Sequence, residues 1–181
     1  MKPELLPACA AGSVERLVVP AHRTYRGLGS AGFHRLHYCE WGKADNPRVV
    51  VCVHGSRGTA RDFDVLARGL AADFRVICPD LAGRRDSEWL GTAMRLDFPQ
   101  LLADLNALLA RLDVDEVDWI GTSLGGLLGR HLARQEGTPI RRLMLLGDDA
   151  PASAQEVAGV RHFLTEKAGT HRRETWECVA A

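Results

Sequence analysis

The chain has 181 residues, which is enough for one domain with a sizeable core. Hydrophobic residues make up 46% of it and charged residues 25%, as is typical of a globular protein. The formal net charge is zero, so composition predicts no attraction to nucleic acid or to an anionic membrane surface. No segment approaches the length of a membrane-spanning helix.

The cysteines indicate a reducing compartment. Their number is five, which is odd, and their spacing is not typical of a metal site. Cys52 and Cys78 lie inside apolar runs, where free cysteine behaves as a small buried hydrophobe. The first residues, "MKPELLPACAAG", lack the sustained apolar stretch of a signal peptide. We therefore expect a cytoplasmic protein that holds no metal and no cofactor.

Apolar and alternating segments predict strands, and amphipathic segments between them predict helices. Strands are expected over 14–20, 34–42, 48–55, 75–80, 116–121 and 140–147. Helices are expected over 59–74, 97–114, 124–135 and 153–167. The run "VVVCV" is continuously apolar, as in a parallel strand that is covered on both faces. The alternation predicts an α/β fold with a mainly parallel sheet and helices on both faces.

The composition changes near Pro151, and this divides the chain into three parts. Residues 1–33 form an N-terminal segment with a possible first strand. Residues 34–151 form the α/β core. Residues 152–181 form a short helical or irregular tail, interpreted as a partial lid or a non-native end, in which no further strand is predicted.

The stretch "DWIGTSLGGLLGRHLA" predicts a buried strand, a sharp turn and a helix. Its centre fits the G-x-S-x-G pattern of a nucleophile elbow, with Ser123 between Gly121 and Gly125. The helix that follows points its N-terminus at the serine, where it favours a developing oxyanion. The alternative is a tightly packed glycine-rich turn in which Ser123 has no chemical role.

The stretch "VHGSRG" follows the central strand and begins a turn. The backbone N–H of Ser56 can donate to an oxyanion there, with the Leu124 N–H as the second donor. His54 resembles a catalytic base, but we interpret it as a histidine that stabilises the loop.

These segments together resemble the α/β-hydrolase fold superfamily, in its broad serine-hydrolase and esterase group. The resemblance is carried by "HYCEWG", "VVCVHGSRGTARDF", "VICPDLAGRRDS", "WIGTSLGGLLG" and "LMLLGDDAP", which occur in the family order. It implies that Ser123 attacks the carbonyl of a small ester, thioester or amide substrate without a cofactor, and that Ser56 and Leu124 hold the oxyanion.

Two features depart from the family pattern. Arg85 stands where the family commonly has glycine, and it would strain the turn if its φ is positive. The lid, the last strands and the late histidine loop of the family are not recognisable, so the chain is interpreted as truncated at its C-terminus. The strand over 140–147 would then lie at an edge of the sheet, and self-association through this exposed sixth strand is expected.

The acid and base of a triad must follow Ser123 in the family order. Asp148 and Asp149 follow the sixth strand, and Asp149 is the predicted acid, although these aspartates could instead cap or turn the chain. The histidines after the serine are His131, His162 and His171. His131 lies about 12 Å further along the same helix and is poorly placed. We take His162 as the predicted base and His171 as its alternative.

The leading hypothesis is thus a serine hydrolase of small acyl substrates, and the alternative is a non-catalytic or truncated pseudo-hydrolase. Cofactor-free peroxidation and carbon–carbon bond hydrolysis also occur on this fold and stay open. A dehalogenase is disfavoured because those relatives have aspartate at the position of Ser123. Dinucleotide binding is disfavoured because "GLGSAG" lacks a strong preceding strand and a following acidic residue.

Overall fold

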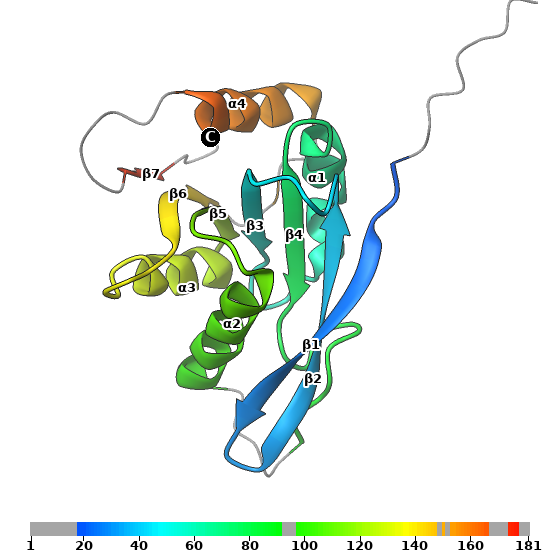
Figure 1. Cartoon of the computed structure of the whole chain (residues 1–181), viewed down its shortest axis with the longest axis vertical. Helices are drawn as coiled ribbons and strands as arrows, with labels where there is room; N and C mark the ends of the chain where they lie inside the picture. Colours follow the sequence, from blue (N-terminus) through cyan, green and yellow to red (C-terminus); the bar gives the residue numbers. More distant parts are fainter. Residues whose placement is uncertain (1–17, 92–96, 148–149, 151–152, 167–173, 178–181) are drawn as a thin grey trace, which may run out of the picture.

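The computed structural model describes residues 18–91, 97–147, 150, 153–166 and 174–177. Its centre is one seven-stranded sheet with the order β1-β2-β4-β3-β5-β6-β7 (Figure 1). The strands are β1 (Ala21–Gly29), β2 (Gly32–Trp41), β3 (Val49–Val53), β4 (Arg75–Asp80), β5 (Val117–Thr122), β6 (Ile140–Leu146) and β7 (Glu174–Glu177).

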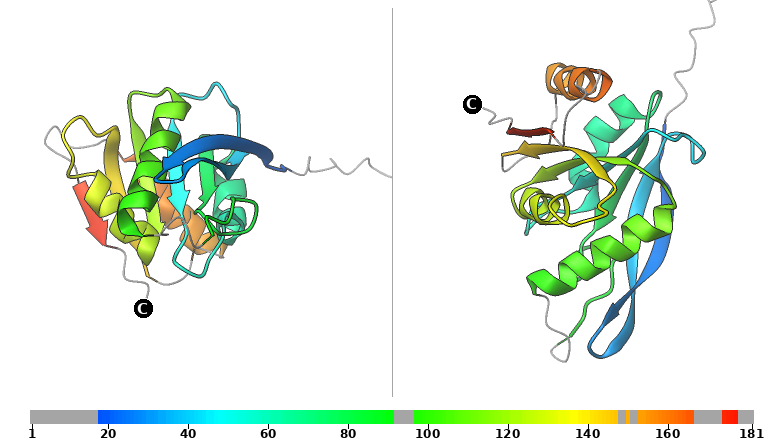
Figure 2. Two further views of the ribbon diagram at one scale, coloured as in Figure 1. Left: turned by 90° about the horizontal axis from the view of Figure 1, so that it is seen from below. Right: turned by 60° about the vertical axis from the view of Figure 1, so that its left-hand side comes forward.

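The sheet is mainly parallel. Strand β2 runs antiparallel to both β1 and β4, whereas the pairs β4–β3, β3–β5, β5–β6 and β6–β7 are parallel. The helices are η1 (Ala60–Phe63, a 3₁₀ helix), α1 (Asp64–Leu70), α2 (Phe98–Leu112), α3 (Leu124–Leu132) and α4 (Ala154–Thr165). Helices α2 and α3 cover one face, and η1, α1 and α4 cover the other (Figure 2). The predicted α/β fold is confirmed.

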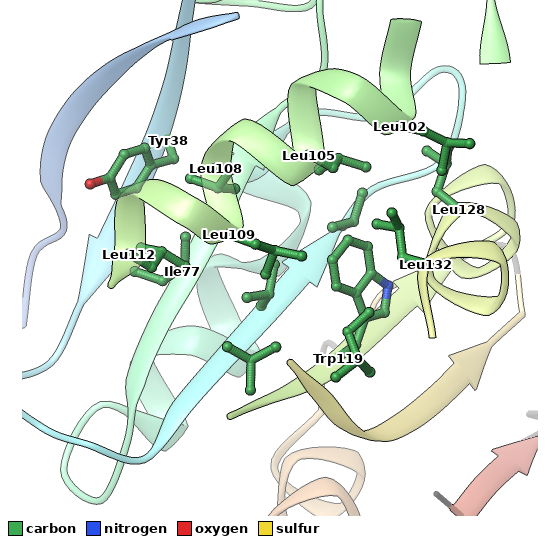
Figure 3. Close-up of a cluster of buried hydrophobic side chains, with 14 of the residues drawn as sticks. Tyr38, Ile77, Leu102, Leu105, Leu108, Leu109, Leu112, Trp119, Leu128 and Leu132 are labelled. Carbon is green, nitrogen blue, oxygen red and sulfur yellow. The ribbon is translucent and has the colours of Figure 1, made fainter. Parts of the chain in front are cut away.

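Helix α2 provides much of the core on its face of the sheet. Its leucines recur at helical spacing, and Figure 3 shows them above Trp119 of β5 and beside Leu128 and Leu132 of α3. Leu105, Leu108 and Trp119 have exposures of 1% or less. The helix begins where the Asp97 side chain accepts a hydrogen bond from the Gln100 N–H at 3.0 Å.

The helix expected over 59–74 is shorter in the structure and has two parts. Thr59 caps η1, and the reciprocal hydrogen bonds between Thr59 and Asp62 form a capping box. Helix α1 continues from η1 and ends at Leu70. The predicted apolar face of Phe63, Leu66 and Leu70 is buried.

The first strand lies later than predicted. Residues 18–20 are not in a strand, and residues 14–17 lie outside the described residues. Instead β1 spans Ala21–Gly29 and forms a hairpin with β2. The glycine-containing stretch "GLGSAG" forms the end of this hairpin, which is consistent with the rejection of a dinucleotide site.

The prediction that no strand follows 140–147 is wrong. The backbone of β7 pairs in parallel with residues Arg142 to Leu145 of β6. Short and rich in charge, "ETWE" lacks the apolar pattern from which a strand is predicted. Because β7 occupies this edge, β6 is not the exposed edge strand that the predicted self-association required.

Within the described ranges, every helix is too short or too polar to cross a membrane. The predicted nucleophile Ser123 follows the last residue of β5, and the predicted oxyanion donor Ser56 lies in the loop after β3.

Candidate active site

Ser123 lies in a strained turn between β5 and α3. Its φ of 43° and ψ of −113° lie in a region of backbone conformation that residues other than glycine rarely adopt. Its N–H donates to the Gly147 carbonyl at 3.2 Å, which ties the turn to the end of β6. The residue is exposed. The backbone thus holds an accessible hydroxyl in a conformation that costs free energy, as a nucleophile elbow does.

The two glycines of the motif are required by close backbone approaches. A Cβ on Gly121 would collide with the backbone of Gly125 and Gly126. A Cβ on Gly125 would collide with the carbonyl of Val53 at the end of β3. The first turn of α3 can therefore pack directly against the sheet only because these positions lack side chains.

The loop after β3 lies beside the serine. A Cβ on Gly55 would lie 3.3 Å from the Ser123 Cβ. The Gly58 N–H donates to the Gly55 carbonyl at 3.1 Å, so residues 55–58 form a tight turn with Ser56 at its second position. Ser56 is exposed, and no hydrogen bond in the described part of the chain uses its N–H. The Leu124 N–H belongs to the first turn of α3, where an N–H has no partner within its own helix.

His54 holds this loop in place. Its ring is fully buried; Nδ1–H donates to the Gly55 carbonyl at 2.7 Å, and Nε2 accepts from the Leu81 N–H at 3.1 Å. Burial lowers the pKa of His54, so the ring is held neutral. The interpretation of His54 as a loop-stabilising histidine is confirmed, and both ring nitrogens are engaged by backbone.

The structure does not bring the other described histidines to Ser123. The His162 side chain is 76% exposed on α4, and its Nε2 lies 2.9 Å from the Glu166 carboxylate. His131 is exposed on α3 and packs against the edge of Phe98. Among the described residues, no carboxylate or imidazole forms a hydrogen bond with Ser123. The predicted acid Asp149, its neighbour Asp148 and the alternative base His171 lie outside the described residues.

The turn after β4 contains the strain that the sequence predicted. Arg85 has a φ of 41°, in the left-handed region that favours glycine. Its guanidinium bonds to the neighbouring carboxylate of Asp86 at 3.2 Å. The polypeptide therefore keeps a strained turn at this position despite the bulky side chain.

A buried polar cluster was missed by the sequence analysis. His37 of β2 contacts the Asp80 carboxylate at the end of β4 through Nδ1 at 2.7 Å. Asp80 also accepts from the Ala60 N–H at 2.7 Å. His22 of β1 and Cys39 of β2 lie beside His37. The signal was the alternation of His37 and Cys39 on one strand face, but their partners come from other strands.

A cavity of about 710 Å³ lies at the opposite end of the central strands, where β3, β4 and β5 begin. Its lining includes Asn46, Arg75 and Glu116, which stand at or just before the first residues of β3, β4 and β5. Ser123 follows the last residue of β5. This cavity therefore does not serve the elbow.

An α/β sheet with a strained serine at the carboxyl end of its central strands is the architecture of the α/β-hydrolase class. A family model described as the alpha/beta hydrolase fold matches residues 48–165. The chain belongs to this family.

Similar proteins include several hydrolases. The chain is 49% identical over 134 residues to a 3-hydroxybutyrate-oligomer hydrolase of Cupriavidus necator, covering 73% of this chain and 46% of that protein. It is 33% identical over 132 residues to the magnesium-chelatase 30 kDa subunit of Rhodobacter capsulatus, covering 70% of this chain and 44% of that protein. An epoxide hydrolase from Vigna radiata matches in structure with a TM-score of 0.63 and 25% identity, covering 75% and 39%. The chain thus spans less than half the length of these relatives.

Proposed function

We propose that Ser123 is the nucleophile of an acyl hydrolase, and that the N–H groups of Ser56 and Leu124 stabilise the oxyanion. The observation that carries this proposal is the strained, exposed conformation of Ser123 against Gly55. Strain of this kind persists only where the surrounding structure imposes it, and it concentrates at functional sites.

The proposed reaction begins with attack of the Ser123 Oγ on the ester carbonyl carbon. The resulting oxyanion accepts hydrogen bonds from the two N–H groups, the alcohol leaves with a proton, and water then hydrolyses the acyl-serine. A histidine must accept the serine proton, and Asp149 and His162 stay the predicted acid and base. His162 can act only if its ring leaves Glu166.

We propose a short hydroxyalkanoate ester as the substrate class. The name of the Cupriavidus necator relative supports this choice, because that protein is 49% identical over most of the present chain. The three described cysteines, Cys39, Cys52 and Cys78, are free thiols, which supports the proposed cytoplasmic location.

The test measures hydrolysis of p-nitrophenyl butyrate and of a 3-hydroxybutyrate dimer by the wild type and by S123A. Turnover that S123A abolishes supports the nucleophile. Cleavage of the butyrate ester but not of the dimer would leave the serine mechanism standing and reject the substrate class.

Ser56 allows a matched test of the oxyanion donor. It occupies the second position of its turn, where proline is readily accommodated, so Ser56→Pro removes the N–H with little change to the turn. We expect kcat to fall by roughly 10²–10³-fold in Ser56→Pro. Ser56→Ala keeps the N–H and should retain the wild-type rate. Equal rates for both variants would contradict the assigned donor.

The second candidate is a protein that keeps the fold without turnover. It is favoured by the hydrogen bonds of the described residues, in which no histidine is paired with Ser123 and His54 is engaged by backbone groups through both ring nitrogens. A rate no higher than that of S123A, from protein shown to be folded by circular dichroism, would select this candidate.

A further inference from the structure

A cluster of three potential metal ligands lies on the β1–β2 hairpin, away from the elbow. In the register of the hairpin, His22 faces Cys39 directly, and His37 is two residues before Cys39 on the same face of β2. One ring nitrogen of His22, one ring nitrogen of His37 and the Cys39 Sγ all lie within 4.8 Å of one another. Three donors from two paired strands thus converge on one point.

The His37 ring presents its free lone pair to this point. Its Nδ1 lies 2.7 Å from the Asp80 carboxylate, which can only accept, so the ring proton is on Nδ1. In the neutral ring Nε2 is therefore the unprotonated nitrogen, and it lies 2.9 Å from His22 Nδ1. Asp80 is itself fixed by the Ala60 N–H. A carboxylate that orients a histidine in this way is the usual second shell of a metal-bound imidazole.

We propose that His22, His37 and Cys39 bind a Zn²⁺ ion, with Asp80 orienting His37. Imidazole and thiolate are the ligands that zinc prefers, whereas magnesium and calcium take oxygen ligands. On binding, the Cys39 thiol releases its proton to water and its sulfur becomes a thiolate ligand. The inference is independent of the proposed hydrolase function.

The two distances from His22 Nδ1 to the other ligand atoms are close to those of a tetrahedral zinc site. Zn–N bonds of about 2.0 Å and Zn–S bonds of about 2.3 Å set N···N at about 3.3 Å and N···S at about 3.6 Å. The present His22 Nδ1 lies 2.9 Å from His37 Nε2 and 3.9 Å from Cys39 Sγ. A small movement of the His22 ring away from His37 and toward Cys39 corrects both distances.

The burial pattern permits this movement and gives the ion an entry path. His37 and Cys39 are buried at 4% and 0% exposure, so their positions are fixed by packing. His22 is exposed, and its ring centroid lies 5.1 Å from that of His37. Water can supply the fourth ligand from the exposed side. The ion would pin the start of the edge strand β1 to β2.

The alternative is a simple hydrogen bond between the two histidines, and metal binding distinguishes the two. Reduced, metal-free protein is titrated with Co²⁺ and followed by absorption, then with Zn²⁺ in competition with a chromophoric chelator. We expect one ion per chain, tetrahedral Co²⁺ bands with a thiolate-to-cobalt charge-transfer band, and a rise in Tm with Zn²⁺.

The variants identify the ligands. Cys39→Ser should abolish the charge-transfer band, and His22→Gln should weaken Zn²⁺ binding roughly 100-fold or more. Cys52→Ala removes another buried free thiol and His131→Gln removes another exposed histidine, so both should bind as the wild type does. His22→Gln alters an exposed side chain and keeps the test open if Cys39→Ser does not fold. A folded wild type that binds no ion, or equal binding by His22→Gln and the wild type, would overturn the proposal.

Discussion

Two turns at the carboxyl end of the sheet each contain a non-glycine residue with a positive φ. Ser123 has a φ of 43° and Arg85 a φ of 41°, and neither is a glycine. The strain at Ser123 presents a hydroxyl, whereas the exposed Arg85 side chain bonds to its neighbour Asp86. The G-x-S-x-G spacing allowed the first to be anticipated, and comparison with the family pattern allowed the second.

Arg85→Gly should remove one of these strains. The left-handed conformation costs a non-glycine residue about 1–2 kcal/mol, which glycine avoids, although glycine also loses more chain entropy on folding. The adjacent Arg84→Gly suffers only the entropy loss, because Arg84 is not at positive φ. We expect Arg85→Gly to be more stable than Arg84→Gly by about 1–2 kcal/mol in urea denaturation. Equal stabilities would show that the turn at Arg85 is unstrained.

His54 should make stability depend on pH. Burial lowers the pKa of His54 in the folded state below its ordinary value. As the pH falls, the unfolded chain therefore binds a proton at this histidine before the folded chain does. The free energy of unfolding should therefore decrease from pH 7.5 to pH 5.5 in the wild type. His54→Asn should show a smaller decrease, whereas the exposed His131→Asn should keep the wild-type decrease. An unchanged pH profile in His54→Asn would contradict the assignment.

At the scale of the elements, a single buried arginine joins β6 to α4. Arg142 is paired with Asp118 of β5 through hydrogen bonds of 2.6 and 2.9 Å. It also donates to the carbonyls of Phe163, Leu164 and Glu166 at the end of α4. These terminal carbonyls have no partner within the helix, so the guanidinium satisfies them and complements the helix dipole.

Arg142→Met should be severely destabilising because it leaves the Asp118 carboxylate buried without its main partner. The expected loss is about 3–5 kcal/mol in urea denaturation. Arg141 also contacts Asp118, but its side chain is 43% exposed. Arg141→Met should therefore cost about 1 kcal/mol or less. Similar losses for the two variants would show that the buried pair has no special weight.

The elements that could be predicted are those whose apolar pattern sets them apart. Strands β3 and β4 and helix α2 are buried along their length or along one face, and their residues show it. In β1 only Tyr25 and Gly27 are buried, so this edge strand has no alternating apolar pattern to reveal it. The cluster of His22, His37 and Cys39 depends on the register of a hairpin, which no local spacing expresses.

For the whole molecule, β7 determines how the sheet ends. It covers the backbone of β6 between Arg142 and Leu145, where an unpaired parallel strand would offer N–H and C=O groups to another chain. We propose that self-association, expected from the sequence, is restrained by this pairing and appears when β7 is removed.

A chain that ends at Glu166 should therefore form larger oligomers than the full 181-residue chain does at the same concentration. Light scattering after size exclusion measures the oligomeric state of both. Leu145→Lys in the shortened chain should reduce the association, because a charged side chain on an edge strand opposes pairing. Leu145 is half-buried and packs against the core, so circular dichroism of the variant must first show that it is folded. If the shortened chain has the same oligomeric state as the full chain, the edge of β6 does not drive association. In that case β7 stabilises the sheet but is not needed to prevent association through β6.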